Sequence, residues 1–391
     1  MESILLKSSS MHEELPLGSI DEIEAIQNLD LPLTEDFSRI VLEERPLIDV
    51  RAPIEYGKGA FPHAINLALM NDQERHLIGI RYKEQGNASA VALGKKLVGP
   101  LKQERVKAWV DFVKSHPNSY LYCFRGGQRS QISQAWMQEA GITIPRLKGG
   151  YKAFRAFLMQ ESERISHQVD TLVLAGRTGS GKTLLIHQLE NSIDLEGLAN
   201  HRGSSFGGFT TAQPSQIDFE DALGYVLIKH ESKKHKYLIL EDESRNIGRI
   251  YIPKPVFNNL KKGELVILNT PMEERVEIIF DEYVTHALKN YTLRYGDAGV
   301  EQWFSDVTSA LLRIKKRIGY ERYRKIHTLF TDAFLLQKKR GDVTQHKGWI
   351  EMLLHEYYDP MYDYQIANSK IPVAFEGSYA EVLAYLKEIK K

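Results

Sequence analysis

Residues 176–183 restrict the fold strongly. They read Gly-Arg-Thr-Gly-Ser-Gly-Lys-Thr, between an apolar stretch at 171–175 that is typical of a buried strand and a helical pattern at 184–189. A strand, a glycine-rich loop and a helix in this order are the required context of a Walker A phosphate loop. The sequence therefore predicts a parallel α/β domain in which this loop binds phosphate groups.

Each residue type in this loop has a part in holding phosphate. Glycines expose successive backbone N–H groups, Lys182 reaches the terminal phosphates, and the Thr183 hydroxyl can bind Mg²⁺. The expected diphosphate-binding or nucleotide-binding residues are Gly176, Arg177, Thr178, Gly179, Ser180, Gly181, Lys182 and Thr183.

A second apolar stretch, residues 237–240, leads into Glu241, Asp242 and Glu243. In phosphate-loop proteins a carboxylate at the end of such a strand helps to hold Mg²⁺. Glu241 and Asp242 are therefore candidate magnesium-linked residues together with Thr183, and the pattern does not decide which of the three carboxylates at 241–243 takes this role. The polar, glycine-rich residues 200–208 are expected either to face the phosphates or the substrate, or to be an ordinary surface loop.

Residues 120–130 read Tyr-Leu-Tyr-Cys-Phe-Arg-Gly-Gly-Gln-Arg-Ser and contain the only cysteine of the chain, Cys123. An apolar run precedes Cys123 and a helical pattern at 131–140 follows, which predicts a strand-to-helix turn. Backbone N–H groups and the positive end of the helix favour a thiolate there. Cys123 is thus the candidate catalytic residue. The expected oxyanion cradle is Phe124, Arg125, Gly126, Gly127, Gln128, Arg129 and Ser130.

Composition excludes several classes of protein. The 51 basic and 51 acidic residues balance, so any nucleic-acid surface must be local, and no DNA partner is expected. A single cysteine without a Cys/His cluster excludes a disulfide scaffold, and no structural metal is expected. No run of about eighteen apolar residues is present, which predicts a soluble cytoplasmic protein without a membrane partner.

The N-terminal part is expected to form a separate parallel-sheet domain, with a buried strand at 46–51. We interpret Asp49 and Arg51 as an ion pair within the fold rather than as site residues. Residues 71–99 form an unusually polar insertion that is expected to cap the cysteine pocket. The predicted boundaries are 1–152 for this domain, 153–168 for a helical linker and 169–391 for the phosphate-loop domain.

The C-terminal part contains a basic stretch, because residues 311–340 have ten basic and two acidic side chains (10 − 2 = +8). Apolar residues from 303 to 318 recur at helical spacing and leave basic residues on other faces. Such a face is either a polyanion site or simply solvated. The tyrosines at 357, 358, 362 and 364 favour a packed turn over a base-stacking surface. The candidate polyanion-binding residues are Arg313, Lys316, Arg317, Arg324, Lys338, Lys339 and Arg340.

The cysteine loop resembles the active-site loop of rhodanese domains. The Ile-Asp-Val-Arg pattern at 48–51 and the Lys-Gly-Gly-Tyr pattern at 148–151 resemble the beginning and end of that fold, although His63 stands where glycine is usual. The spacing Cys-x5-Arg to Arg129 is one residue wider than in many sulfurtransferases and equals that of cysteine-dependent phosphatases. The loop alone therefore supports either chalcogen transfer or phosphate-ester cleavage.

A rhodanese-like domain followed by a phosphate-loop domain resembles the bacterial tRNA 2-selenouridine synthase family over essentially the whole chain. The motifs at 81–83, 123–130, 176–183 and 201–204 carry the resemblance. The implied fold class is α/β, with an N-terminal rhodanese-like parallel-sheet domain and a C-terminal P-loop NTPase-like α/β domain that has a helical, basic C-terminal region.

The resemblance implies a two-step reaction on the wobble 2-thiouridine of tRNA. Geranyl diphosphate first geranylates the sulfur, and selenophosphate then supplies selenium through a perselenide on Cys123. The phosphate loop would hold geranyl diphosphate rather than an NTP, with Mg²⁺ as an expected cofactor. The basic residues of 313–340 become candidate tRNA contacts, and a protein that supplies selenophosphate is a further candidate partner.

Two alternatives belong to other classes. A cysteine-dependent phosphatase or sulfurtransferase with a regulatory nucleotide-binding domain would hydrolyse phosphate esters or transfer sulfur at Cys123. A nucleotide-gated adaptor, in which the rhodanese fold only binds partners, would not need Cys123 at all.

Overall fold

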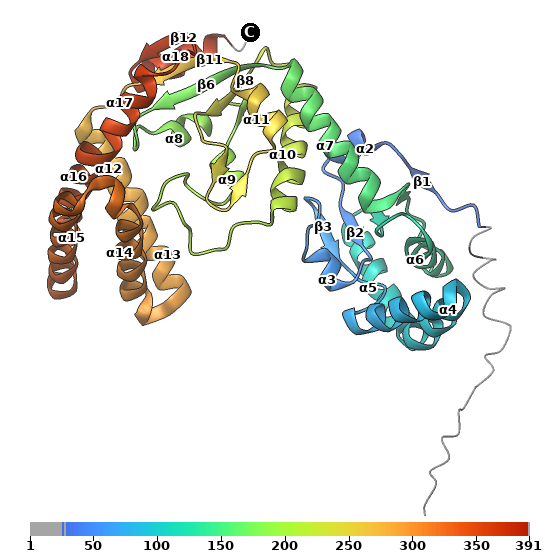
Figure 1. Ribbon diagram of the computed structural model, residues 1–391. Coiled ribbons are helices and arrows are strands. Elements are labelled where there is room, and N and C mark those ends of the chain that lie inside the picture. Colours follow the sequence, from blue (N-terminus) through green and yellow to red (C-terminus); the bar gives the residue numbers. More distant parts are fainter. Residues whose placement is uncertain (1–25, 27–28, 390–391) are drawn as a thin grey trace, which may run out of the picture. The chain divides into compact units, whose positions relative to one another are not determined.

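The computed structural model describes residue 26 and residues 29–389. The chain forms two compact units, Met1–Phe157 and Leu158–Lys391, each with its own parallel sheet (Figure 1). The division falls inside helix α7 (Gly150–Gln168), and this helix contains residues 153–168, which were expected to be helical.

The first unit is built on a five-stranded sheet in the order β1-β5-β4-β2-β3, and every pair of neighbours is parallel. The central strand β4 ends directly before Cys123, so the cysteine lies at the carboxyl edge of the sheet, where α/β proteins bind ligands. The strands are β1 (Leu33–Thr34), β2 (Leu47–Asp49), β3 (Ala64–Asn66), β4 (Tyr120–Tyr122) and β5 (Arg146–Leu147).

Helices cover this sheet, and the polar insertion is one of them. Residues 72–98 form helix α4, which is interrupted at Gly86, where φ is 80° and ψ is −174°. Asn71 caps the start of α4, because its side chain accepts a hydrogen bond from the Glu74 amide. The helices are α2 (Phe37–Leu42), α3 (Pro53–Tyr56), α4 (Asp72–Val98), the 3₁₀ turn η1 (Gly99–Leu101), α5 (Lys102–Ser115) and α6 (Gln128–Glu139).

Asp49 and Arg51 form the buried ion pair that the sequence favours. Arg51 Nη2 lies 2.6 Å from Asp49 Oδ2 and 2.8 Å from the Gly59 carbonyl oxygen, which ties the end of β2 to the following loop. His63 has a φ of 62°, which lies in the left-handed region. Backbone in this region is unfavourable for residues with a side chain and favourable for glycine. This conformation explains why glycine is usual at that position in rhodanese domains.

The second unit also has a five-stranded parallel sheet, in the order β12-β11-β6-β8-β7. The predicted strands at 171–175 and 237–240 are confirmed as β6 and β8, and each extends slightly further. The strands are β6 (Asp170–Gly176), β7 (Ser192–Ile193), β8 (Tyr237–Glu241), β11 (Glu264–Leu268) and β12 (Val373–Gly377), with a separate antiparallel pair β9 (Asn246–Ile247) and β10 (Ile250–Tyr251).

Helices account for most of the second unit. Trp303, Leu311, Ile314 and Ile318 are buried in one apolar cluster, as their helical spacing predicts. The helices are α8 (Lys182–Ile186), α9 (Leu195–Leu198), α10 (Gln216–Ser232), α11 (Lys254–Leu260), α12 (Met272–Phe280), η2 (Asp281–Thr285), α13 (His286–Tyr295), η3 (Gly296–Ala298), α14 (Gly299–Ile318), α15 (Tyr320–Arg340), α16 (His346–Leu353), η4 (Leu354–Tyr358), α17 (Asp359–Ala367) and α18 (Tyr379–Glu388).

None of the helices in the described part of the chain combines the length and the apolar character that crossing a bilayer demands.

Candidate functional site

Cys123 lies in a tight turn between β4 and α6. Its side chain is buried, and Sγ lies 3.2 Å from the hydroxyl oxygen of Ser130. Helix α6 begins at Gln128, so its free backbone N–H groups are close behind the sulfur. This arrangement favours an anion at the end of β4, whether a thiolate or a bound oxyanion.

The segment that ends the rhodanese-like fold holds this turn in place. The Cys123 carbonyl accepts a hydrogen bond of 2.9 Å from the Tyr151 amide. A Cβ atom on Gly150 would lie 2.3 Å from the Cys123 carbonyl oxygen, and Gly150 has a φ of 60°. Only glycine fits there, which explains the Gly-Gly pair of the 148–151 motif.

The two loop arginines have different surroundings. Arg129 donates to both carboxylate oxygens of Glu55, at 2.6 and 3.2 Å, and Arg75 also pairs with Glu55. Burial alone would raise the pKa of Glu55, but the hydrogen bonds from Arg129 lower it below its usual range. Arg125 is exposed and lies over the ring of Phe124. Glu55 thus fixes Arg129 at the loop.

A third arginine, Arg146, was not singled out by the sequence. It is buried on β5, beside β4, and donates to the Gln134 side chain at 2.8 Å. Burial lowers its pKa, whereas the charge of the Cys123 sulfur raises it, so the guanidinium and the sulfur are electrostatic neighbours. The signal in the sequence would have been a charged residue at the start of an otherwise apolar strand.

The phosphate loop of the second unit has the geometry that its motif predicts. Gly179 and Gly181 have φ values of 80° and 85°, which other residues rarely adopt. Lys182 Nζ donates to the Gly176 carbonyl at 2.9 Å, and it therefore lies folded over the loop. A cavity of about 280 Å³ opens at this loop, and residues 176 and 178–183 line it.

Of the candidate magnesium-linked carboxylates, Glu241 is the one that meets the phosphate loop. The Thr183 hydroxyl donates to Glu241 Oε1 at 2.7 Å, and Glu241 Oε2 is buried without a hydrogen-bond partner. Asp242 instead pairs with Lys261. A hydroxyl beside a partnerless buried carboxylate oxygen fits Mg²⁺ that takes its other ligands from phosphate and water.

Residue 26 and residues 29–389 contain no group of three or more His, Cys, Asp or Glu side chains that could hold a metal ion by themselves.

Glu196, a further carboxyl group in this cavity, escaped sequence reasoning. Glu196, in the short helix α9, hydrogen-bonds Glu243. Burial and the charges of Glu241 and Glu243 raise the pKa of Glu196 far above its ordinary value, and burial also raises that of Glu243. Glu196 is therefore protonated near neutral pH and donates to Glu243. Only the tertiary fold brings residues 196 and 243 together.

Part of the glycine-rich loop at 200–208 lies at the phosphate-loop cavity, so it is not merely a surface loop. Arg202, Gly203, Ser204 and Ser205 all line the cavity. The Arg202 guanidinium carbon lies 4.1 Å from the centre of the Phe209 ring and 4.8 Å from that of Tyr283. These stacking contacts hold a cation at the cavity wall, where it can contact a polyphosphate.

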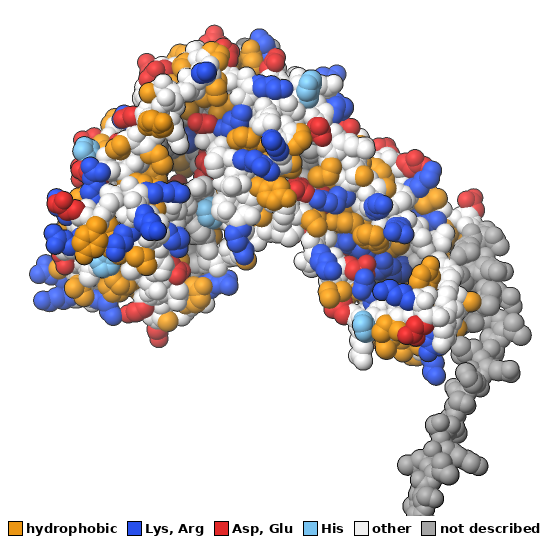
Figure 2. All heavy atoms as spheres, in the orientation of Figure 1, with side chains coloured by type: hydrophobic (Ala, Val, Ile, Leu, Met, Phe, Trp, Pro, Cys, Tyr) orange, Lys and Arg blue, Asp and Glu red, His pale blue; other side chains and the backbone are white. Residues whose placement is uncertain are grey.

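The basic residues of the C-terminal part fall into two groups. Arg317 lines the phosphate-loop cavity, and Arg313 donates to the Ser205 carbonyl at 2.7 Å. Arg313 and Arg317 are themselves exposed; the other five do not line this cavity, and Figure 2 shows Lys and Arg side chains gathered over α14 and α15. Lys338 among them pairs with Glu301. The second group, also exposed, consists of Lys316, Arg324, Lys338, Lys339 and Arg340.

The four tyrosines are partly a packed cluster. Tyr357 and Tyr358 are buried in η4, while Tyr364 is 70% exposed. Tyr357, Tyr358 and Tyr362 line the phosphate-loop cavity.

The fold and the two loops define a protein with a rhodanese-like cysteine domain and a phosphate-loop domain. A family model described as the tRNA 2-selenouridine synthase AAA domain matches residues 169–391, and one described as a rhodanese-like domain matches residues 34–157. The chain belongs to the tRNA 2-selenouridine synthase family.

Curated relatives agree with these matches. The tRNA 2-selenouridine synthase of Sulfurovum sp. is 54% identical over 362 residues, which cover 92% of this chain and 100% of the relative. That of Shewanella frigidimarina is 45% identical over 359 residues, which cover 91% of this chain and 98% of the relative. The expected fold class and family are thus confirmed.

The carboxyl pair predicts a pH dependence of stability. The raised pKa of Glu196 means that its stabilising contribution is complete below the ordinary carboxyl value of 4.5 and is lost as pH rises through the folded-state pKa. Glu196→Gln keeps a neutral hydrogen-bond donor but removes the titration. We expect this variant to gain stability relative to the wild type as pH rises above 4.5, by at most about 1.4 kcal/mol per pH unit.

Chemical denaturation at several pH values measures this difference, with the exposed Glu273→Gln as a control. A difference between Glu196→Gln and the wild type that stays constant with pH would show that Glu196 is ionised in the fold.

Proposed function

We propose that this protein is an enzyme that converts 2-thiouridine in tRNA to 2-selenouridine, the product in the names of its relatives. The observation that carries the proposal is the presence of two anion sites in one chain. One holds a nucleophilic sulfur beside Ser130, and the other holds a lysine, a hydroxyl and a carboxylate at a phosphate loop. Two separate sites suit two successive reactions.

The first reaction is geranylation at the phosphate loop. The sulfur of wobble 2-thiouridine attacks C1 of geranyl diphosphate, the C1–O bond breaks, and diphosphate leaves with the electron pair. Lys182 and the loop amides bind the diphosphate and stabilise the charge that develops on it. Thr183 and Glu241 would hold Mg²⁺, which neutralises part of that charge.

A small apolar pocket adjoins the phosphate-loop cavity, and Thr178, Ser204 and Tyr283 line both. Its volume of about 20 Å³ is room for about one water molecule, so it holds neither a geranyl chain nor a nucleoside in this conformation. The support for a prenyl diphosphate is the character of this wall, because a nucleoside needs polar partners there and a hydrocarbon chain does not. Its apolar and aromatic lining consists of Phe206, Ile279, Tyr283, Trp349, Ile350, Leu353, Leu354 and Tyr358.

The second reaction is selenium transfer at Cys123. The thiolate attacks the selenium of selenophosphate, and the Se–P electron pair stays on phosphorus, which leaves as phosphite after taking up a proton. The perselenide then adds to C2 of the geranylated base, and geranylthiolate leaves. An external thiol must next reduce the S–Se bond to release 2-selenouridine, and a second thiol frees Cys123 from the resulting mixed disulfide, because the chain has no other cysteine.

Geranylation makes this exchange feasible. Sulfide is a poor leaving group from C2, whereas an alkylated sulfur leaves as a thiolate once selenium has added. The cradle from Phe124 to Ser130 would bind the phosphoryl part of selenophosphate, with Arg129 held at its edge by Glu55. The reaction requires tRNA in the cytoplasm and a source of selenophosphate, which a dedicated supplying enzyme would provide.

Separate variants of the two loops test this division of labour. Cys123→Ala should still produce geranylated tRNA from 2-thiouridine tRNA but no 2-selenouridine. Lys182→Ala should lower geranylation by at least about 100-fold, because the diphosphate loses its main countercharge, yet should still convert tRNA that is already geranylated. Mass spectrometry of digested nucleosides measures both products. Loss of geranylation in Cys123→Ala would contradict the assignment of one step to each loop.

The exposed basic residues of α14 and α15 are the proposed tRNA-backbone contacts. Lys316→Glu combined with Arg324→Glu should weaken tRNA binding and reduce the slope of log affinity against log salt by roughly 0.7–0.9 for each phosphate that is no longer neutralised. Lys262→Glu, exposed elsewhere in the same unit, serves as the matched control. If the double variant and the control show equal slopes of log affinity against log salt, this face does not contact the tRNA backbone and is an ordinary solvated surface.

A further inference from the structure

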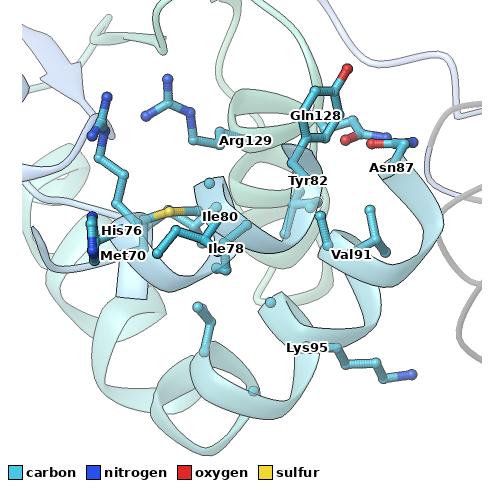
Figure 3. Close-up of a pocket in the computed structure, with 18 of the residues that line it drawn as sticks. Met70, His76, Ile78, Ile80, Tyr82, Asn87, Val91, Lys95, Gln128 and Arg129 are labelled. Carbon is cyan, nitrogen blue, oxygen red and sulfur yellow. The ribbon is translucent and has the colours of Figure 1, made fainter. Parts of the chain in front are cut away.

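A large apolar cavity in the first unit has no role in the function described so far. Its volume is about 890 Å³, within the range of small-molecule sites. Figure 3 shows Met70, Ile78, Ile80 and Val91 around it, with Gln128 and Arg129 along one side. Because Ile80 is 40% exposed, apolar surface here remains open to solvent.

The bend in α4 creates this cavity. The helix turns back at Gly86, so residues from both of its arms face the same space. Small residues, Gly79, Ala90 and Gly94, line it and leave room between the arms. A Cβ on Gly79 would have no heavy atom within 4 Å, so the space in front of it is empty.

The cavity adjoins the cysteine loop through the first turns of α6. Gln128, Arg129 and Ile132 line the cavity, while Ser130, between them in sequence, contacts the Cys123 sulfur. Cys123 also belongs to the apolar cluster against which Ile78 and Ile132 pack. One helix end therefore separates the reacting sulfur from the cavity.

Charge at the cavity is almost entirely positive. Glu55 is the only acidic side chain among its lining residues within the described part of the chain, and it is already paired with Arg129 and Arg75. An apolar interior with a basic rim suits a hydrocarbon group attached to a polyanion. The basic lining residues are Arg75, Lys83, Lys95, Lys102 and Arg129, with His76 beside them.

We propose that this cavity binds the geranyl chain of S-geranylated tRNA during selenium transfer, with C2 of the base directed to Cys123 and the RNA backbone on the basic rim. The inference rests on the proposed function and adds a second site for the isoprenoid chain, separate from the donor site at the phosphate loop. The perselenide adds to C2, the C2–S bond breaks with its electrons on sulfur, and the geranylthiolate takes a proton from water.

The same cavity selects between two tRNAs. The 2-thiouridine that enters the first reaction has no geranyl chain to bury. The cavity therefore adds no binding free energy for it and does not position it at the perselenide. The geranylated tRNA gains the burial of its whole chain. Selenium is therefore delivered only to the base whose sulfur can leave.

A filling substitution tests the site. Gly79→Phe should place a ring in the empty space, while Ala88→Phe adds the same ring to an exposed position of α4 outside the cavity. With selenium-loaded enzyme and tRNA that is already geranylated, we expect Gly79→Phe to raise KM at least tenfold over Ala88→Phe. The preference of the wild type for S-geranyl over S-methyl tRNA should collapse in Gly79→Phe alone.

Several outcomes would overturn the proposal. An unchanged KM and an unchanged chain-length preference in folded Gly79→Phe would show that the chain lies elsewhere. Loss of geranylation from geranyl diphosphate, with selenium transfer intact, would assign the cavity to the donor. Val91→Trp provides a second filling variant if Gly79→Phe does not fold.

Direct binding separates this proposal from the proposed function. Geraniol should change the fluorescence of Trp136, which lines the cavity, in the wild type and Ala88→Phe but not in Gly79→Phe. If the wild type never geranylates tRNA, the proposed function fails, yet geraniol binding still decides whether the cavity takes an isoprenoid chain. Absence of that signal in the wild type would refute the cavity assignment.

Discussion

Backbone N–H groups that are left unpaired between a strand and a helix are the constraint on which both loops depend. One such turn runs from Cys123 to the start of α6 at Gln128, and the other runs from the end of β6 to the start of α8 at Lys182. Such groups need an anion or water, and the glycines at both loops remove the side chains that would fill the space. Each parallel sheet thus presents an anion site at its carboxyl edge.

Charged side chains then give each loop its own chemistry. In the first unit, Glu55 holds Arg129 in place at the loop and Arg146 lies near the sulfur, so the nucleophile has a cationic neighbour. In the second unit, Glu241 accepts a hydrogen bond from the Thr183 hydroxyl next to Lys182, an arrangement that would suit Mg²⁺ and a diphosphate leaving group. The first set suits attack by sulfur or selenium, and the second suits departure of phosphate.

Local patterns in the sequence allowed much of this to be predicted. The phosphate loop, the strand before it and the turn after Cys123 are continuous in sequence, and all three formed as expected. The buried Asp49–Arg51 pair was also predictable, because its partners are two residues apart at a strand end. The polar pattern at 71–99 did not reveal that residues 72–98 form a bent helix with an apolar cavity beside it.

The residues that sequence reasoning missed all act through distant partners. Glu55 meets Arg129 across 74 positions, and Glu196 meets Glu243 only because α9 and the end of β8 adjoin in the fold. Arg146 faces Cys123 because β5 pairs with β4. No local periodicity carries that information, since it depends on strand order.

The central claim is that Cys123 accepts selenium rather than a phosphoryl group, and its loop spacing is compatible with both. The direct measurement is high-resolution mass spectrometry of the pure protein after incubation with selenophosphate, without tRNA or thiol. Selenium and a phosphoryl group add nearly the same mass, so the isotope pattern on the Cys123 peptide must distinguish them. We expect the selenium pattern together with release of phosphite, and adding thiol should remove the adduct. An adduct without the selenium pattern, or none at all in an enzyme that still forms 2-selenouridine, would contradict the perselenide route.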